Sequence, residues 1–270
     1  MNKKIIRISI SGALGKMGKC LIQEIKNFKT LCLNSIIIKK DKNITNNNKK
    51  TLQNLKKNKI KVYTEINNHK DFDVLIDFTN PKNTMKNVNF CYKYNKKIII
   101  GTTGLSKENY LDIKEKSKKI SILYSTNFSI GINLILNLLK ITTKQIGKDS
   151  DIEIIESHHR HKIDSPSGTA LTLGKSIAKH MKLNLDDIAV YNRNHSNYQR
   201  KKNEIGFSSI RAGETIGKHS ILFSTQGENI TITHQAFNRK SFAHGALKSA
   251  IWIYNKKNGL FNINDVLKNQ

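Results

Sequence analysis

The chain has 270 residues, which is long enough for two ordinary domains or for one large domain with a substantial buried core. Hydrophobic residues make up 37% of it, and its 15 glycines and 2 prolines are far too few for a collagen-like or low-complexity scaffold. Lysine and arginine total 47 against 20 acidic residues, so the formal net charge is +27.

This positive charge alone would suggest a nucleic-acid partner. Only six of the 47 basic residues are arginines, however, and arginine is the side chain that binds phosphate through two parallel hydrogen bonds. The excess of lysine, together with many asparagines and isoleucines, indicates a compositional drift spread over permissive surface positions. We therefore expect no specific nucleic-acid partner, and a basic nucleic-acid-binding protein remains an alternative.

The cysteines and the apolar runs indicate where in the cell the protein is expected. Cys20, Cys32 and Cys91 are an odd number without Cys-x-x-Cys spacing, which is typical of reduced thiols in the cytoplasm. The longest apolar stretch, 130–139, is about half the length that spans a bilayer. We expect a cytoplasmic protein without membrane contact.

The first half of the sequence alternates short β-type runs with helical patterns. Strands are expected at residues 7–11, 31–38, 73–78, 97–101 and 120–124. The Lys- and Asn-rich segment 39–61 is expected to be a solvated excursion. Strands that alternate with helices predict crossover connections and a parallel sheet covered on both faces.

The second half changes character. Helices are expected at 130–146, 170–181 and 241–254, and strands at 151–157, 205–211, 219–225 and 229–234. The turn at 226–228 joins the last two strands as a hairpin. These elements predict an α+β unit with a mixed or antiparallel sheet. We divide the chain into one domain of residues 1–128, to which residues 239–270 return, and a second domain of residues 129–238.

A glycine turn, Gly12-Ala13-Leu14-Gly15-Lys16-Met17-Gly18, lies between the first expected strand and the first expected helix. Glycine permits a tight turn and lets backbone N–H groups approach a pyrophosphate, which a helix N-terminus also favours. The spacing is GxxGxxG, with Leu14 where the usual GxGxxG has its second glycine. The turn favours a dinucleotide site, and a tight turn without a ligand is the alternative.

The end of the second expected strand bears on the cofactor. Dinucleotide folds usually have an acidic residue there that binds the adenosine ribose. In this chain Ile38 is followed by Lys39 and Lys40, and no acid precedes Asp41. Cationic side chains suit a 2′-phosphate better than two hydroxyls, so NADPH is favoured over NADH. The alternative is a pair of surface lysines without a ligand.

The segment 157–170 combines basic side chains with a Pro/Ser/Gly turn that leads into a helix. The basic residues are His158, His159, Arg160, His161 and Lys162. A metal site of the three histidines is disfavoured, because the two cations would repel a metal ion and no carboxylate or thiolate has matching spacing. An anion site fits better, since residues 167–169 add N–H and hydroxyl donors at a helix start. A histidine transfers protons near pH 7. A solvated basic loop is the alternative, and we expect no metal.

Taken together, the motifs resemble the dihydrodipicolinate reductase family, the 4-hydroxy-tetrahydrodipicolinate reductases of the diaminopimelate route to lysine. The matching motifs are Gly12-x-x-Gly15-x-Met17-Gly18, Asp77-Phe78-Thr79, Gly101-Thr102-Thr103-Gly104, Asn127-Phe128-Ser129-x-Gly131, Glu156-x-His158-His159-Arg160-His161-Lys162-x-Asp164-x-Pro166-Ser167-Gly168-Thr169-Ala170, Gly206-Phe207, Arg211-Ala212-Gly213, Gly217-x-His219 and Thr233-His234. They occur in the family's order, and the likeness extends to Leu267.

The resemblance implies an α/β fold, with an N-terminal Rossmann-type parallel-sheet domain that binds the dinucleotide. It implies a C-terminal α+β domain with a mixed sheet for substrate binding and tetramerisation. The implied reaction reduces (2S,4S)-4-hydroxy-2,3,4,5-tetrahydrodipicolinate to tetrahydrodipicolinate with loss of water, by hydride from NADPH or NADH, in a homotetramer. Another two-domain NAD(P)-dependent reductase is the alternative.

The resemblance also implies roles for single residues. His158 corresponds to the proton donor or acceptor and Lys162 to the proton donor. The implied substrate contacts are His159, Gly168 and Thr169. The implied cofactor contacts are Gly12, Ala13, Leu14, Gly15, Lys16, Met17, Lys39, Gly101, Thr102, Thr103, Ser125, Thr126, Asn127 and Phe128. The chain departs from many members at Ile38, where they have an acid, and at Leu14, where they have a small residue. Lys39 stands where an arginine often serves the 2′-phosphate.

Overall fold

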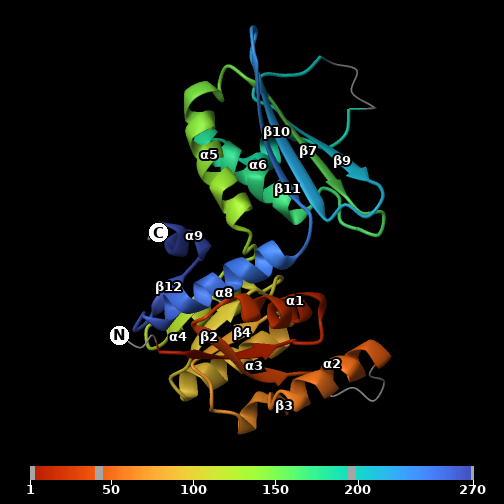
Figure 1. Ribbon diagram of the computed structural model, residues 1–270. Helices are drawn as coiled ribbons and strands as arrows, with labels where there is room; N and C mark the ends of the chain where they lie inside the picture. Colours follow the sequence, from red (N-terminus) through yellow and green to blue (C-terminus); the bar gives the residue numbers. More distant parts are fainter. Residues whose placement is uncertain (1–3, 40–44, 194–198, 269–270) are drawn as a thin grey trace. The chain divides into compact units, whose positions relative to one another are not determined.

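The computed structural model describes residues 4–39, 45–193 and 199–268. The chain divides into two compact units, which are shown in Figure 1. The first unit combines residues 1–130 with residues 239–270, and the second unit contains residues 131–238.

The first unit is built on a seven-stranded sheet in the order β12-β6-β5-β4-β1-β2-β3, and all its pairings are parallel. Its strands are β1 (Ile6–Ser11), β2 (Leu31–Ile37), β3 (Lys61–Tyr63), β4 (Val74–Asp77), β5 (Lys97–Ile100), β6 (Ser121–Tyr124) and β12 (Gly259–Phe261). The strand order reverses between β1 and β4. In open α/β sheets this switch point is where ligands bind, outside the carboxyl ends of the strands. The predicted Rossmann-type parallel sheet is confirmed.

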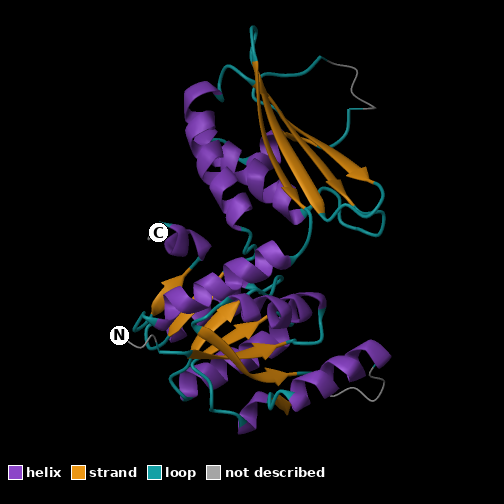
Figure 2. Ribbon diagram, in the orientation of Figure 1, coloured by secondary structure: helices purple, strands orange, loops and turns teal. Residues whose placement is uncertain are grey.

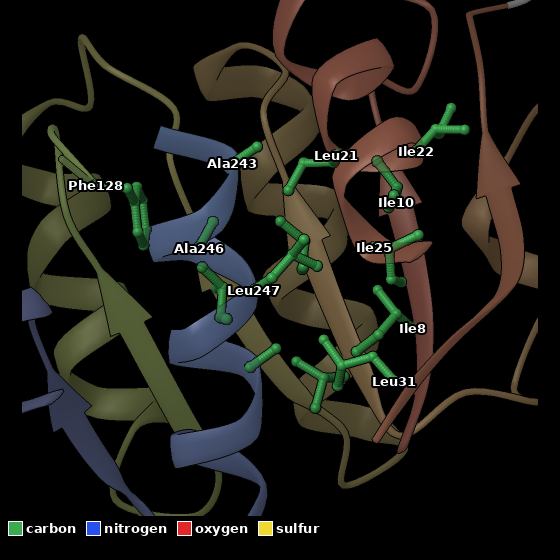
Figure 3. Packing of buried hydrophobic residues seen from close by; sticks show 14 of the residues in the cluster. Ile8, Ile10, Leu21, Ile22, Ile25, Leu31, Phe128, Ala243, Ala246 and Leu247 are labelled. Carbon is green, nitrogen blue, oxygen red and sulfur yellow. The ribbon is translucent and has the colours of Figure 1, made fainter. Parts of the chain in front are cut away.

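Helices cover both faces of this sheet (Figure 2). They are α1 (Lys16–Glu24), α2 (Asn46–Lys57), α3 (Pro81–Lys93), α4 (Lys107–Lys116), α8 (Lys240–Tyr254) and α9 (Ile263–Leu267), with 3₁₀ turns at Ile25–Asn27 and Ile66–Asn68. Side chains alternate along each strand, so Ile76 of β4 joins the core under α1 and α8, whereas Leu75 joins the core under α3 and α4. Figure 3 shows Leu21 of α1 and Leu247 of α8 in the first of these cores. Two-sided burial explains the continuous apolar runs in the sequence.

Most of the described residues in the predicted solvated excursion 39–61 are exposed, but they form regular structure instead of an irregular excursion. Residues 46–57 form α2, and Lys61 begins β3, which pairs in parallel with β2. Leu52 and Leu55 of α2 contact the core under α1, and Leu55 is buried. Two leucines among lysines and asparagines are a weak periodic signal, so tertiary packing decides this helix. The elements β12 and α9 were also not expected.

The second unit has a five-stranded sheet in the order β11-β10-β7-β9-β8. Its elements are α5 (Ile130–Ile146), which starts at the unit boundary, β7 (Asp151–His158), α6 (Gly168–Met181), α7 (Leu185–Ile188), β8 (Ala189–Val190), β9 (Ile205–Arg211), β10 (Gly217–Ser224) and β11 (Asn229–Ala236). β7 pairs antiparallel with β10 and parallel with β9, which confirms the predicted mixed sheet. The predicted hairpin is also present, since Thr225 N–H donates to the Glu228 carbonyl at 2.9 Å.

The inner face of the second sheet changes from apolar to polar along β7. The first row across β9, β7 and β10 is Ile205, Ile152 and Phe223, and the second is Phe207, Ile154 and Ile221. All six side chains are buried against α5 and α6. The third row is Ser209, Glu156 and His219, and after it His158 ends β7 beside Arg211. The core therefore gives way to polar side chains at the carboxyl end of β7, of which Glu156, His158 and His219 are buried.

Within the described residues, no helix combines the length and the apolar character that crossing a bilayer requires.

Candidate active site

The glycine turn joins β1 to α1 and contacts the end of β4. Gly12 has a φ of +80°, in the left-handed region that only glycine adopts readily. A Cβ at Gly12 would lie 2.5 Å from the Phe78 carbonyl oxygen, and one at Gly18 would lie 2.4 Å from the Gly12 oxygen. Backbone packing therefore requires glycine at both positions. Leu14 is not among the residues with positive φ, so its side chain is accommodated without backbone strain.

Several amides of the turn already have partners. The N–H groups of Gly12 and Ala13 donate to the Ile37 carbonyl at 3.1 and 3.4 Å, and Gly15 N–H donates to Gly12 at 3.0 Å. Among the described residues, Leu14 and the first two residues of α1, 16 and 17, have amides without a backbone partner. The N-cap residue Gly15 provides no side-chain hydrogen bond to them. These amides form the part of the turn that can bind an anion.

A cavity of about 950 Å³ opens beside this turn. It is lined by residues from the carboxyl ends of β1, β2 and β4, and among the predicted cofactor contacts by Gly12, Leu14, Gly15 and Lys39. Lys86 and Lys93 of α3 add positive charge, and Glu65 is the acidic residue in the lining. A large cavity at the switch point, next to unpartnered helix-start amides and several cations, fits a dinucleotide with its phosphates at α1. Lys40 and Asp41 lie outside the described residues.

The other predicted cofactor contacts do not line this cavity. They are Ala13, Lys16, Met17, Gly101, Thr102, Thr103, Ser125, Thr126, Asn127 and Phe128. Those from 101 onward follow β5 or β6. Thr102 is buried, and its hydroxyl accepts the Thr79 N–H at 3.1 Å, while Phe128 packs in the core with its ring 5.6 Å from that of Phe78. The structure therefore places them at the carboxyl edge of the same sheet.

In the second unit, Glu156 and His158 form the centre of the polar end of β7. Both are buried, with Glu156 1% and His158 7% exposed. His158 Nδ1 is hydrogen-bonded to Glu156 Oε2. Arg211 donates to both carboxylate oxygens, at 2.6 Å to Oε1 and 3.0 Å to Oε2. Ser209 Oγ and the Ser167 N–H both donate to Glu156 Oε1, at 2.8 and 3.3 Å.

Burial and these hydrogen bonds determine the charge states of Glu156, His158 and His219. Burial alone would raise the pKa of Glu156, but hydrogen bonds from Arg211, Ser209 and His158 lower it to about 2. Burial lowers the pKa of His158, and Glu156 only partly opposes this effect. Burial also lowers the pKa of His219 to about 4. Near neutral pH the carboxylate is therefore ionised and both imidazoles are neutral.

The segment after β7 contains the residues predicted to form an anion site. Lys162 Nζ contacts both carboxylate oxygens of Asp164, at 2.7 and 2.9 Å. That pairing and a hydrogen bond from Gly168 N–H lower the pKa of Asp164. The charge of Lys162 also lowers the pKa of His158. His159 is half-buried, and its ring centroid lies 6.1 Å from that of His161.

Helix α6 begins beside these groups. The Ser167 Oγ accepts from Ala170 N–H at 3.1 Å and lies 3.0 Å from His219 Nε2. A Cβ at Gly168 would meet no atom within 4 Å, and Gly168 is exposed while Thr169 is half-buried. The start of α6 therefore faces open space beside Lys162 and His158. The structure brings together the predicted proton-transfer and substrate-contact residues.

Sequence reasoning predicts no role for Glu156, Arg211, Ser209 or His219. Three of them belong to the motifs shared with the family, but hydrogen bonding across strands cannot be read from spacing. The alternation along β7, in which Ile152 and Ile154 are followed by Glu156 and His158, could have placed the carboxylate and the imidazole on one buried face.

One group of potential metal ligands occurs in the described part of the chain. Ligand atoms of Glu156, His158 and His219 lie within 4.8 Å of one another. Both Glu156 oxygens accept from the Arg211 guanidinium, whose charge opposes a metal cation. The donor set therefore fits a hydrogen-bond network better than a metal centre. His158, His159 and His161 do not form such a group in that part of the chain.

Comparison with known proteins covers nearly the whole chain. Residues 6–128 match the family model described as dihydrodipicolinate reductase, N-terminus, and residues 131–267 match the one described as its C-terminus. A 4-hydroxy-tetrahydrodipicolinate reductase of Buchnera aphidicola subsp. Cinara cedri is 52% identical over 98% of each chain. The one of Buchnera aphidicola subsp. Schizaphis graminum is 47% identical over 100% of each.

Solved structures agree with this result. The dipicolinate-bound dihydrodipicolinate reductase from Paenisporosarcina sp. TG-14 matches with a TM-score of 0.77 and 25% identity, over 96% of this chain and 97% of that one. A probable dehydrogenase from Thermotoga maritima has a TM-score of 0.64 at 12% identity, over 97% of this chain and 92% of that one, which shows a shared fold.

The predicted two-part α/β fold and the predicted oxidoreductase activity are thus confirmed. Use of a reduced nicotinamide dinucleotide, NAD(P)H, follows from the N-terminal match. Both halves and the full-length relatives identify one family, so the chain belongs to the dihydrodipicolinate reductase family.

Proposed function

We propose that the chain reduces (2S,4S)-4-hydroxy-2,3,4,5-tetrahydrodipicolinate to tetrahydrodipicolinate with loss of water, in lysine biosynthesis through diaminopimelate. The observation on which this depends is the juxtaposition of a buried neutral imidazole, His158, with the Lys162 ammonium of the loop that leads to α6. The names of the relatives and the dipicolinate bound to the structural neighbour support this substrate class.

The substrate is a dicarboxylate, and the second unit offers matching donors. Lys162 supplies a positive charge, and the first residues of α6, Gly168 and Thr169, supply a helix start for a carboxylate. His159 stands next to the same loop, since Lys162 N–H donates to the His159 carbonyl at 3.1 Å. We assign these residues to substrate binding.

Proton transfer falls to His158 and Lys162. Hydride addition to a conjugated imine builds negative charge on the ring nitrogen, which a nearby cation stabilises and then protonates. Lys162 is the proton donor in this assignment, and His158 is the donor or acceptor that completes the proton balance. A positioned acid of this kind contributes roughly 10²–10⁴-fold in rate.

The dinucleotide belongs to the first unit, where it supplies the hydride when bound. Gly12, Leu14, Gly15 and the helix-start amides of residues 16 and 17 would hold the phosphates. We also assign Ala13, Lys39, 101–103 and 125–128 to cofactor binding, from their match to the family motifs. Residues 1–128 with 239–270 are the dinucleotide-binding domain, and residues 129–238 are the substrate-binding and tetramerisation domain.

We propose NADPH as the preferred cofactor. Lys39 lines the cavity with an exposed side chain that can reach an adenosine 2′-phosphate. The test compares kcat/KM for NADPH and NADH in the wild type and in Lys39→Ala. The variant is expected to lose about tenfold with NADPH and little with NADH, because a hydrogen bond to a charged group is worth roughly 1.5–3 kcal/mol when buried and less when exposed. An unchanged ratio would remove this argument.

The outer face of the second sheet supports a homotetramer. Ile155 of β7 and Ile210 of β9 are 39% and 48% exposed. An exposed apolar patch on a sheet fits a second copy of the chain. We expect Ile155→Lys to reduce the mass measured by light scattering. The three free thiols agree with a cytoplasmic location.

The overall activity is tested by coupling. Substrate is generated in situ from pyruvate and aspartate semialdehyde by a synthase, and loss of reduced-nicotinamide absorbance is followed. We expect oxidation that requires both the synthase and this chain. Absence of oxidation with a folded chain and either cofactor would refute the proposal.

A further inference from the structure

Glu156 is the common partner of several groups at the end of β7. Its Oε2 is bonded to His158 Nδ1 and to Arg211, and its Oε1 to Arg211, Ser209 and the Ser167 N–H. The carboxylate is 1% exposed. A buried charge of this kind is tolerated only when it is paired and hydrogen-bonded, and here the Arg211 guanidinium supplies the opposite charge.

The bond to His158 has a chemical consequence. A carboxylate with a pKa of about 2 is ionised at neutral pH and can only accept hydrogen bonds. The neutral imidazole of His158 must therefore donate from Nδ1, which leaves the lone pair on Nε2. Gly217 lies at that nitrogen, since a Cβ on Gly217 would be 3.0 Å from Nε2. The glycine thus leaves Nε2 uncrowded on that side.

The other oxygen of Glu156 reaches the anion site. Ser167 donates its N–H to Oε1 and uses its hydroxyl to cap α6 at Ala170. One carboxylate therefore holds both the imidazole and the first turn of the helix that begins with Gly168 and Thr169.

We propose that Glu156 is a positioning residue for this reaction: its carboxylate keeps the His158 proton on Nδ1, so that Nε2 is the atom that gains and returns a proton, and it anchors the start of α6 beside it. The inference rests on the proposed role of His158. When Nε2 takes up a proton, the ring becomes an imidazolium that stays bonded to Glu156 through Nδ1–H. When that proton leaves, the neutral Nδ1–H form returns, and Glu156 remains ionised throughout.

Several charged or titratable groups face His158. Glu156 on its own strand stabilises the imidazolium, whereas Arg211 of β9 and Lys162 of the following loop destabilise it. His219 of β10 contacts it edge-on, with ring centroids 5.1 Å apart. Without the Glu156 charge, burial and both cations act in the same direction, so the pKa of His158 falls further.

The most direct test measures the tautomer of His158 in the wild-type chain, where the network is unaltered. The full chain is labelled with ¹⁵N-histidine, and the His158 signals are identified by their absence in His158→Gln. At pH 8 we expect a protonated Nδ1 and an unprotonated Nε2. A wild-type His158 protonated on Nε2 would overturn the proposal, and this result does not depend on any Glu156 variant being folded.

Glu156→Gln tests the effect on the reaction. A glutamine amide does not fix the Nδ1–H tautomer, so we expect mixed His158 tautomers and a kcat at least tenfold lower. Glu156→Asp keeps the charge and should recover part of the kcat and of the Nδ1–H population. A folded Glu156→Gln chain with wild-type tautomer and kcat would contradict the proposal.

Glu153→Gln is the matched control. Glu153 is a carboxylate on the same strand that pairs with Arg193 and Arg200 instead. Its loss is expected to change stability and to leave the His158 spectrum unchanged. A general response of β7 to lost charge would instead disturb His158 in both variants, which would count against a specific role for Glu156.

Turnover of His158→Ala and the tautomer of wild-type His158 together distinguish a wrong role for Glu156 from a wrong proposed function. If His158→Ala keeps wild-type turnover, the proposed role of His158 falls, and with it the role of Glu156 in the reaction. If His158→Ala is inactive while wild-type His158 carries its proton on Nε2, the proposed function stands and only the positioning role of Glu156 falls.

Discussion

The glycine turn of the first unit and the carboxyl end of β7 in the second are built by opposite means. At the turn, side chains are excluded, because Gly12 adopts a positive φ and Gly18 lies against the Gly12 carbonyl. At the end of β7, charged and polar side chains are buried. Glu156, for example, is hydrogen-bonded to both His158 and Arg211.

The two regions therefore tolerate different kinds of substitution. A site formed by backbone amides allows neighbouring side chains to vary, so the turn accommodates Leu14 without a positive φ. In a network of paired side chains each member leaves a buried partner unsatisfied when it is replaced. Substitutions should therefore act mainly through shape in the first unit and through charge and hydrogen bonding in the second.

The largest effect is expected in the second unit. Lys162→Ala and His158→Ala should each lower kcat at least tenfold, since each removes a proton-transfer group worth roughly 10²–10⁴-fold. The measurement is kcat in the coupled assay, with circular dichroism to confirm folding. Lys179→Ala removes an exposed lysine from α6 and is the control. Near-normal turnover in both variants would refute the assignment.

The second largest effect is expected for a substitution in the glycine turn. Gly12→Ala forces a side chain into the left-handed region and toward the Phe78 carbonyl, so we expect the free energy of unfolding to fall by about 2–4 kcal/mol. Gly104 also has a positive φ, +76°, but its Cβ would meet no atom within 4 Å. Gly104→Ala should therefore cost only about 1–2 kcal/mol in urea unfolding. Equal losses in the two variants would show that the close contact at Gly12 does not matter.

Acidification should distinguish the two units. His219 has a pKa of about 4 in the folded chain against 6.5 when exposed, so it stabilises the second unit above pH 6.5. This contribution, up to about 3 kcal/mol, is lost as the pH falls toward 4, because the unfolded chain then binds the extra proton. His158 acts in the same direction. In the first unit, burial lowers the pKa of His69 but raises that of Asp77, so the two effects oppose each other.

The single tryptophan, Trp252, reports the first unit, and amide exchange of β7 and β10, corrected for its intrinsic pH dependence, reports the second. We expect exchange protection in the second unit to fall between pH 6.5 and 4 before the fluorescence changes. A His219→Asn variant should flatten this dependence. Simultaneous loss of both signals in the wild type would contradict the expected order.

The same contrast explains what could be predicted from the sequence. The glycine turn and the basic segment 157–170 are each one continuous stretch of chain, so their residue types and spacing predict a dinucleotide turn and an anion site. The parallel sheet followed from apolar runs such as 97–101, whose burial on both sides leaves no alternation. In each of these cases the physical cause lies within one short stretch of chain.

The features that could not be predicted, helix α2 and the polar network at the end of β7, depend on contacts between stretches that are distant in the sequence. Helix α2 has two core-facing leucines among polar residues, and its packing on the first sheet was invisible locally. The polar network required the register that sets Ser209 and His219 opposite Glu156. Sequence spacing cannot give this register, since β9 and β10 lie more than 40 residues after β7.

The smallest effect concerns Asp164, which holds the Lys162 ammonium and accepts from Gly168 N–H, two of the groups assigned to the substrate. A substrate carboxylate must compete with this internal one. Asp164 is 60% exposed, so the pair is worth at most about 1 kcal/mol, and Asp164→Asn should lower KM by up to about fivefold with kcat within twofold. High salt should shrink the difference, because salt screens exposed charges. A raised KM would mean that Asp164 orients Lys162 for the substrate instead of competing with it.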